Sequence, residues 1–135
     1  MNDTRITPRE AFDSAAEKFQ RASQQWAAHT RTARQQQQAA ADYEFDLKVR
    51  EATLRLEPEI SEGKNAEQRA AMLRLLIEND EDYTNLQSAM ASARENAQSS
   101  MDSASEASND MSLYRRLMDF EIALLRNAEV LGNGD

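Results

Sequence analysis

The chain lacks cysteine and has few glycines, prolines and aromatic residues. The absence of cysteine excludes disulfides, thiolate metal sites and a cysteine nucleophile. Only 3 glycines and 2 prolines occur in 135 residues, and aromatic residues make up 6%, which favours long helices around a thin core. No apolar run approaches the roughly 18–20 residues of a membrane span, and the N-terminus lacks the apolar segment of a signal peptide. We therefore expect a soluble cytoplasmic protein without membrane contact.

Two series of apolar and small residues repeat with the spacing of helices that pack along their length. The first has a member at every seventh position: Phe12, Phe19, Trp26, Ala33, Ala40, Leu47 and Leu54. The second alternates steps of three and four residues: Tyr83, Leu86, Met90, Ala93, Ala97, Ser100, Ala104, Ala107, Met111, Tyr114 and Met118. Strands would alternate instead. The pattern predicts an all-α fold, a long antiparallel helical hairpin that resembles a coiled coil.

Capping residues set the limits of the expected helices. Thr7 and Glu10 around Pro8 form a good helix start, and the next breaker is Pro58, so the first helix should span about 8–57. After a connection over 58–64, Asn65 and Gln68 open a short helix over about 65–78. The third helix should run from about 81 to 131, where glycines end it. We expect a mobile tail at 1–6, a single domain over 7–131, and a C-terminal tail at 132–135.

When the first helix folds back onto the third, large apolar residues meet at both ends of the hairpin and small residues meet in its middle. Phe12, Phe19 and Trp26 should form the core at one end. At the other end Phe45, Leu47, Leu54 and Leu56 should meet the start of the third helix. The short helix is apolar on much of its circumference, so we expect it to be buried on several sides through Met72, Leu73, Leu75, Leu76 and Ile77.

A second apolar seam runs beside the main one near the C-terminus. Its members are Leu113, Leu117, Phe120, Leu124 and Leu131. One partner helix cannot cover both seams, and exposed apolar stripes of this kind mark association surfaces. The seam predicts a homodimer, with the two hairpins forming a helical bundle.

Acidic residues are concentrated around the connection between the long helices. Residues 57–82 hold 8 acidic and 3 basic side chains. Seven of the acids form the candidate docking end for a basic partner protein: Glu57, Glu59, Glu62, Glu78, Asp80, Glu81 and Asp82. A Mg²⁺ or Ca²⁺ site is the alternative, but EF-hand spacing is missing and helix starts favour acids in any case. We therefore assign no metal and no cofactor.

A basic strip over residues 18–41 is the one segment that suggests nucleic acid. It contains Lys18, Arg21, Arg31 and Arg34 without an acid, together with Trp26. Single-strand binders combine such charges with a stacking aromatic residue. The net charge of −8 opposes nucleic-acid binding, because phosphate contacts need a basic surface. Pairing with Asp102, Glu106 and Asp110 across the hairpin explains the charges, and Trp26 lies on the apolar frame as a core residue.

Nothing in the sequence favours catalysis. His29 is the only histidine, and no nucleophile motif or glycine-rich phosphate loop accompanies it. We expect a non-enzymatic protein.

Several segments resemble small coiled-coil proteins from the early, recombination-associated gene regions of bacteriophages and prophages. The resemblance covers roughly residues 50–126 and rests on Gly63–Arg69, Leu73–Ile77, Asn79–Tyr83, Tyr114–Leu117 and Leu124-Leu125. It implies a protein-binding accessory to DNA-processing machinery, without catalytic residues. The leading hypothesis is an acidic helical interaction module with an unknown protein partner. The alternatives are a nucleic-acid accessory binder acting through residues 18–41, and a structural scaffold or secretion-associated hairpin.

Overall fold

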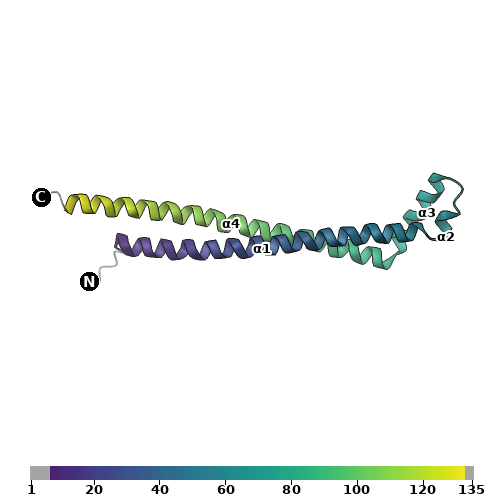
Figure 1. Ribbon diagram of the computed structural model, residues 1–135, viewed down its shortest axis with the longest axis horizontal. Coiled ribbons are helices and arrows are strands. Elements are labelled where there is room, and N and C mark those ends of the chain that lie inside the picture. The colour runs from purple at the N-terminus through teal and green to yellow at the C-terminus, as the bar shows by residue number, and fades with distance from the viewer. Residues whose placement is uncertain (1–6, 133–135) are drawn as a thin grey trace. The chain divides into compact units, whose positions relative to one another are not determined.

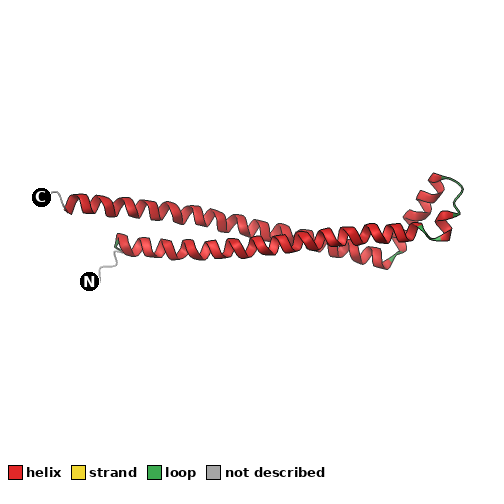
Figure 2. Cartoon of the chain, viewed as in Figure 1, coloured by secondary structure: helices red, strands yellow, loops and turns green. Residues whose placement is uncertain are grey.

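The computed structural model describes residues 7–132, with side chains described for residues 7–129. The described part contains helices and no strand (Figure 2). The helices are α1 (Pro8–Arg55), α2 (Pro58–Ser61), α3 (Ala66–Asn79) and α4 (Glu81–Gly132) (Figure 1). The long α1 packs against α4, which confirms the predicted all-α helical hairpin. The predicted tail at 1–6 and the last three residues lie outside the described residues.

The helix starts follow the capping pattern of the sequence. The Glu10 N–H donates to Thr7 Oγ1 at 3.2 Å, and the Thr7 N–H donates to Glu10 Oε2 at 3.4 Å, so the predicted capping box is confirmed. At α3 the Gln68 N–H donates to Asn65 Oδ1 at 2.8 Å. The Gln68 side chain accepts from the N–H of Lys64 instead of that of Asn65. The return bond of the second capping box is therefore made to the residue before the N-cap. The predicted connection over 58–64 contains the short helix α2.

The chain divides into two compact units, and both long helices run through each of them. The terminal unit consists of residues 7–31 and 100–132, and the connecting unit consists of residues 32–99. In the connecting unit Glu44 faces Arg94 and Arg50 faces Asp80, so the helices there are antiparallel. In the terminal unit Lys18 lies over the ring of Tyr114. The single domain over 7–131 stays a prediction.

Alanine and leucine form the buried seam between the long helices. In the terminal unit the buried apolar residues are Ala15, Ala22, Ala104 and Ala107. In the connecting unit they are Ala33, Ala40, Leu47, Leu54, Ile60, Ala93 and Ala97. These are members or neighbours of the two predicted series, apart from Ile60 on α2. Small side chains let two helices approach closely, and α4 continues through the Ser-rich segment 99–108 without a break.

Three aromatic or aliphatic residues predicted in the core are exposed instead. Phe45 is 66% exposed and Leu56 is 81% exposed. Phe45 lies two residues from the buried Leu47, and two residues turn a helix by about 200°, so Phe45 points away from α4. Leu56 follows the last residue of α1 and lies in the turn before α2, where the helical pattern no longer applies. Trp26 is 43% exposed, so the prediction of a core tryptophan was wrong. The fully buried apolar residues of the terminal unit are alanines, whose small side chains let the helices approach closely.

The short helix α3 is not buried on several sides, contrary to the prediction. None of its residues is buried, and Leu75 is 59% exposed. Its main helical neighbour is α2, which has only four residues. An element of that size cannot cover a helix that is apolar on much of its circumference, and α3 keeps Met72, Leu73, Leu76 and Ile77 half-buried.

Candidate interaction surfaces

The predicted second seam is an exposed apolar stripe on α4 in the terminal unit. We call Leu113, Leu117, Phe120 and Leu124 the α4 stripe; they are 51%, 42%, 59% and 38% exposed. The neighbouring residues Tyr114, Met118 and Leu125 belong to the main seam and are half-buried. Helix α1 therefore covers one face of α4 and leaves the adjacent face open. Leu131, the fifth predicted member, lies outside the residues with described side chains.

The start of α1 limits how much of α4 can be covered. The Lys18 Nζ lies 6.0 Å from the ring centroid of Tyr114. Because antiparallel helices advance at the same rise per residue, Pro8 then falls near Leu124. In the terminal unit α4 continues past the first turn of α1 (Figure 1). The last turns of α4 thus have no neighbour from α1.

One of the seven acids predicted to form the docking end, Asp80, is held by a strong interaction within the chain. Asp80 accepts from Arg50 Nε at 2.9 Å and from Arg50 Nη2 at 2.6 Å, and its side chain is only 13% exposed. Hydrogen bonds from Arg50 hold the pKa of Asp80 below its ordinary value, while burial opposes this shift and the Tyr83 N–H adds to it. The Asp80 hydrogen bond likewise raises the pKa of Arg50. Asp80 is therefore a structural residue.

The other six predicted acids are exposed on three elements of the connecting unit. They are Glu57, Glu59 and Glu62 around α2, Glu78 on α3, and Glu81 and Asp82 in the first turn of α4. No group of three or more His, Asp or Glu side chains within the described residues is arranged to hold a metal ion. The helix starts account for several of these acids, since carboxylates oppose the helix dipole there.

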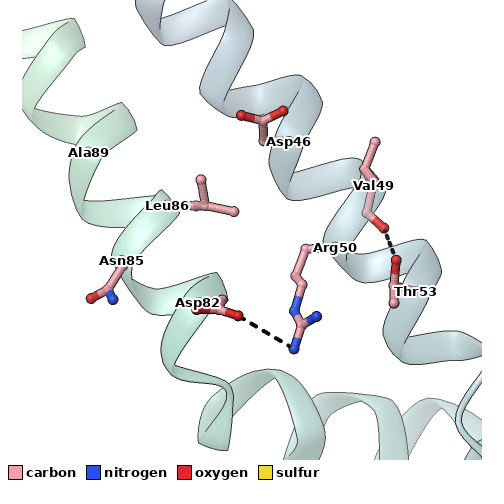
Figure 3. Close-up of a pocket in the computed structure, with 8 residues that line it drawn as sticks. All are labelled: Asp46, Val49, Arg50, Thr53, Asp82, Asn85, Leu86 and Ala89. Carbon is pink, nitrogen blue, oxygen red and sulfur yellow. Dashed lines mark hydrogen bonds and ion pairs between the residues drawn. The ribbon is translucent and has the colours of Figure 1, made fainter.

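A groove between α1 and α4 in the connecting unit was not predicted from the sequence. It has a volume of about 640 Å³ and is lined by Asp46, Val49, Arg50, Thr53, Asp82, Asn85, Leu86 and Ala89 (Figure 3). The Asp82 carboxylate lies 3.9 Å from Arg50 Nη2, and Thr53 Oγ1 donates to the Val49 carbonyl at 2.9 Å (Figure 3). The groove combines apolar side chains with two carboxylates and the guanidinium of Arg50.

In the basic strip, Lys18 and Arg21 have neighbours on their own helix and on α4. Arg21 pairs with Glu17 on its own helix at 3.2 Å, and Lys18 lies over Tyr114. Lys18 and Arg21 line a shallow hollow of about 160 Å³ together with Asp110, so one of the predicted acids is close to them. Trp26 is exposed on the same helix.

No helix within the described residues is long and apolar enough to cross a bilayer. Comparisons of the chain with protein-family models, with curated proteins and with solved structures give no match.

Proposed function

We propose that this protein is a non-enzymatic helical interaction module that self-associates through the α4 stripe. The observation that carries the proposal is the exposure of four large apolar side chains at heptad spacing on one face of a helix. Single exposed leucines are common on protein surfaces, but a contiguous stripe marks an interface. Covering each leucine or phenylalanine contributes on the order of 1–2 kcal/mol.

A second copy is the occupant that the stripe fits best. Its spacing of four, three and four residues is that of the a and d positions of a coiled coil, which accept an equivalent helix. Homo-oligomers with two-fold symmetry use the same surface on both subunits. The exposed carboxylates near α2 and α3 remain available in such a dimer to a basic partner protein, which we propose as the second interaction surface.

Size-exclusion chromatography with light scattering tests the dimer. The unmodified protein should elute with twice the monomer mass at tens of micromolar, a concentration above the dissociation constant expected for such an interface. The double variant Leu117→Gln/Leu124→Gln should be monomeric. The matched control is Ile122→Gln, which removes an exposed apolar side chain from the opposite side of α4. A monomeric unmodified protein would refute the proposal.

The exposure of Trp26 favours one second candidate function, binding of single-stranded nucleic acid by residues 18–41. An exposed indole on the same helix as Lys18 and Arg21 has the stacking and charge features of single-strand binders. The net charge of −8 opposes this function, so it ranks below self-association.

A further inference from the structure

The α4 stripe has charged residues along its two edges, and these define how two copies can align. With Leu117 and Leu124 at a positions and Leu113 and Phe120 at d positions, Arg116 occupies a g position and Glu121 an e position. Arg116 is exposed and Glu121 is half-buried beside the main seam. Neither forms an ion pair within the described residues.

In a parallel pair of helices, the g residue of one helix faces the e residue five positions further along its partner. Arg116 and Glu121 are five positions apart. A parallel, in-register pair therefore places Arg116 beside Glu121 of the partner subunit, and the two-fold axis repeats this contact with the roles exchanged. The stripe thus carries its own complementary charges.

An antiparallel pair would leave both charges without a partner. Reversing one helix places equivalent edges against each other, so Arg116 would lie beside Ala123 of the partner subunit. Glu121 would lie beside Tyr114 of the partner subunit. The apolar contacts are satisfied in either direction, since Leu113 can face its own copy or Leu124. The edge charges therefore decide between the two alignments.

We infer that the α4 stripe binds the same stripe of a second copy in a parallel, in-register arrangement, with Arg116 paired to Glu121 of the partner subunit. This inference rests on the proposed function. The contact begins at Leu113, because Asp110 and Glu106 occupy the preceding a and d positions and would face their own copies. Like charges facing each other separate the helices there.

Disulfide crosslinking tests the alignment. Because the chain has no native cysteine, an introduced cysteine can crosslink only with another introduced cysteine. Leu113→Cys and Leu124→Cys are made singly and oxidised under mild conditions. In the parallel pair each cysteine faces its own copy at a distance that a disulfide can span, so each variant should crosslink with itself. In a mixture of the two variants, tagged to differ in mass, a dominant 113–124 crosslink would overturn the parallel arrangement.

Light scattering on the reduced variants separates this inference from the proposed function. A dimer that crosslinks only between positions 113 and 124, or that fails to crosslink at either position, refutes the alignment and leaves self-association standing. A monomer in the reduced state of both variants and of the unmodified protein refutes the proposed function as well.

Charge exchange tests the Arg116–Glu121 contact independently. Arg116→Glu places two carboxylates together at both edges, so the dissociation constant should rise roughly tenfold. Adding Glu121→Arg reverses each pair and should restore the dimer. Arg115→Glu is the control, because it makes the same charge change at the neighbouring position outside the interface. An equal effect of the Arg115 and Arg116 variants, or failure of the double variant to recover, contradicts the inference; circular dichroism checks that each variant remains helical.

Discussion

Arg50 holds Asp80 with two hydrogen bonds, from Nε at 2.9 Å and from Nη2 at 2.6 Å. Asp80 also caps α4, because its Oδ2 accepts from the Tyr83 N–H at 2.9 Å. Its own backbone N–H donates to the Ile77 carbonyl at the end of α3. Asp80 therefore ends α3 through its backbone N–H, while its carboxylate caps α4 and binds Arg50 of α1.

We predict that Arg50→Gln lowers the melting temperature more than Arg55→Gln. Arg55 is the matched control, because it pairs with Glu51 four residues earlier on the same exposed helix at 2.8 Å. Exposed pairs of that kind contribute little, whereas Arg50 joins elements that are distant in the sequence. Thermal unfolding followed by circular dichroism measures both variants. Equal losses would mean that the Arg50–Asp80 contact adds nothing beyond a surface pair.

The lowered pKa of Asp80 predicts a loss of stability in acid. Because the folded-state pKa lies below the ordinary value of 3.8, the ionised carboxylate stabilises the fold at pH values above 3.8. This contribution is lost as the pH falls through the folded-state pKa. Urea unfolding of the unmodified protein and of Asp80→Asn should therefore differ at neutral pH and converge in strong acid.

Glu81→Gln is the control for this pH dependence, because it removes an exposed carboxylate from the same helix start. Its difference from the unmodified protein should be smaller at neutral pH than that of Asp80→Asn. A gap between the unmodified protein and Asp80→Asn that stays constant from about pH 7 to about pH 2 would contradict the prediction.

Leu54 near the end of α1 and Leu56 just after the helix provide a test of the seam. Leu54 is 5% exposed and Leu56 is 81% exposed. Leu54→Ala should cost about 2 kcal/mol of unfolding free energy, near the low end for core leucines because this core is thin. Leu56→Ala should change it by less than about 0.5 kcal/mol. Denaturant unfolding measures both, and a larger loss for Leu56 would mean that another surface covers this residue.

Nucleic-acid binding is predicted to be absent, and Trp26 provides the readout. It is the only tryptophan and is exposed, so a base stacking on it would quench its fluorescence. Single-stranded and duplex oligonucleotides at moderate salt should cause no saturable quenching at micromolar protein, because the protein carries a net charge of −8. Salt-sensitive quenching that disappears in Arg31→Ala/Arg34→Ala would place nucleic-acid binding ahead of self-association.

The sequence by itself determined the helices and the seam between them. Helical limits depend on local signals, such as the Thr7–Glu10 capping box, the break at Pro58 and the acids at the start of α4, and these act over a few residues. The seven-residue spacing of Ala33, Ala40, Leu47 and Leu54 was also sufficient to identify buried positions, because helical periodicity fixes which residues share a face.

Only the tertiary structure decided which side chains the two helices enclose. Trp26 belongs to the predicted seven-residue series but is exposed, whereas the buried residues of the terminal unit are alanines, which let the two helices approach closely. The Arg50–Asp80 contact joins residues 30 positions apart, and no local pattern encodes it. The groove beside Val49 and Leu86 likewise depends on how α1 and α4 face each other in the connecting unit. Periodicity selects a face of a helix, whereas the fit of opposing side chains decides what that face covers.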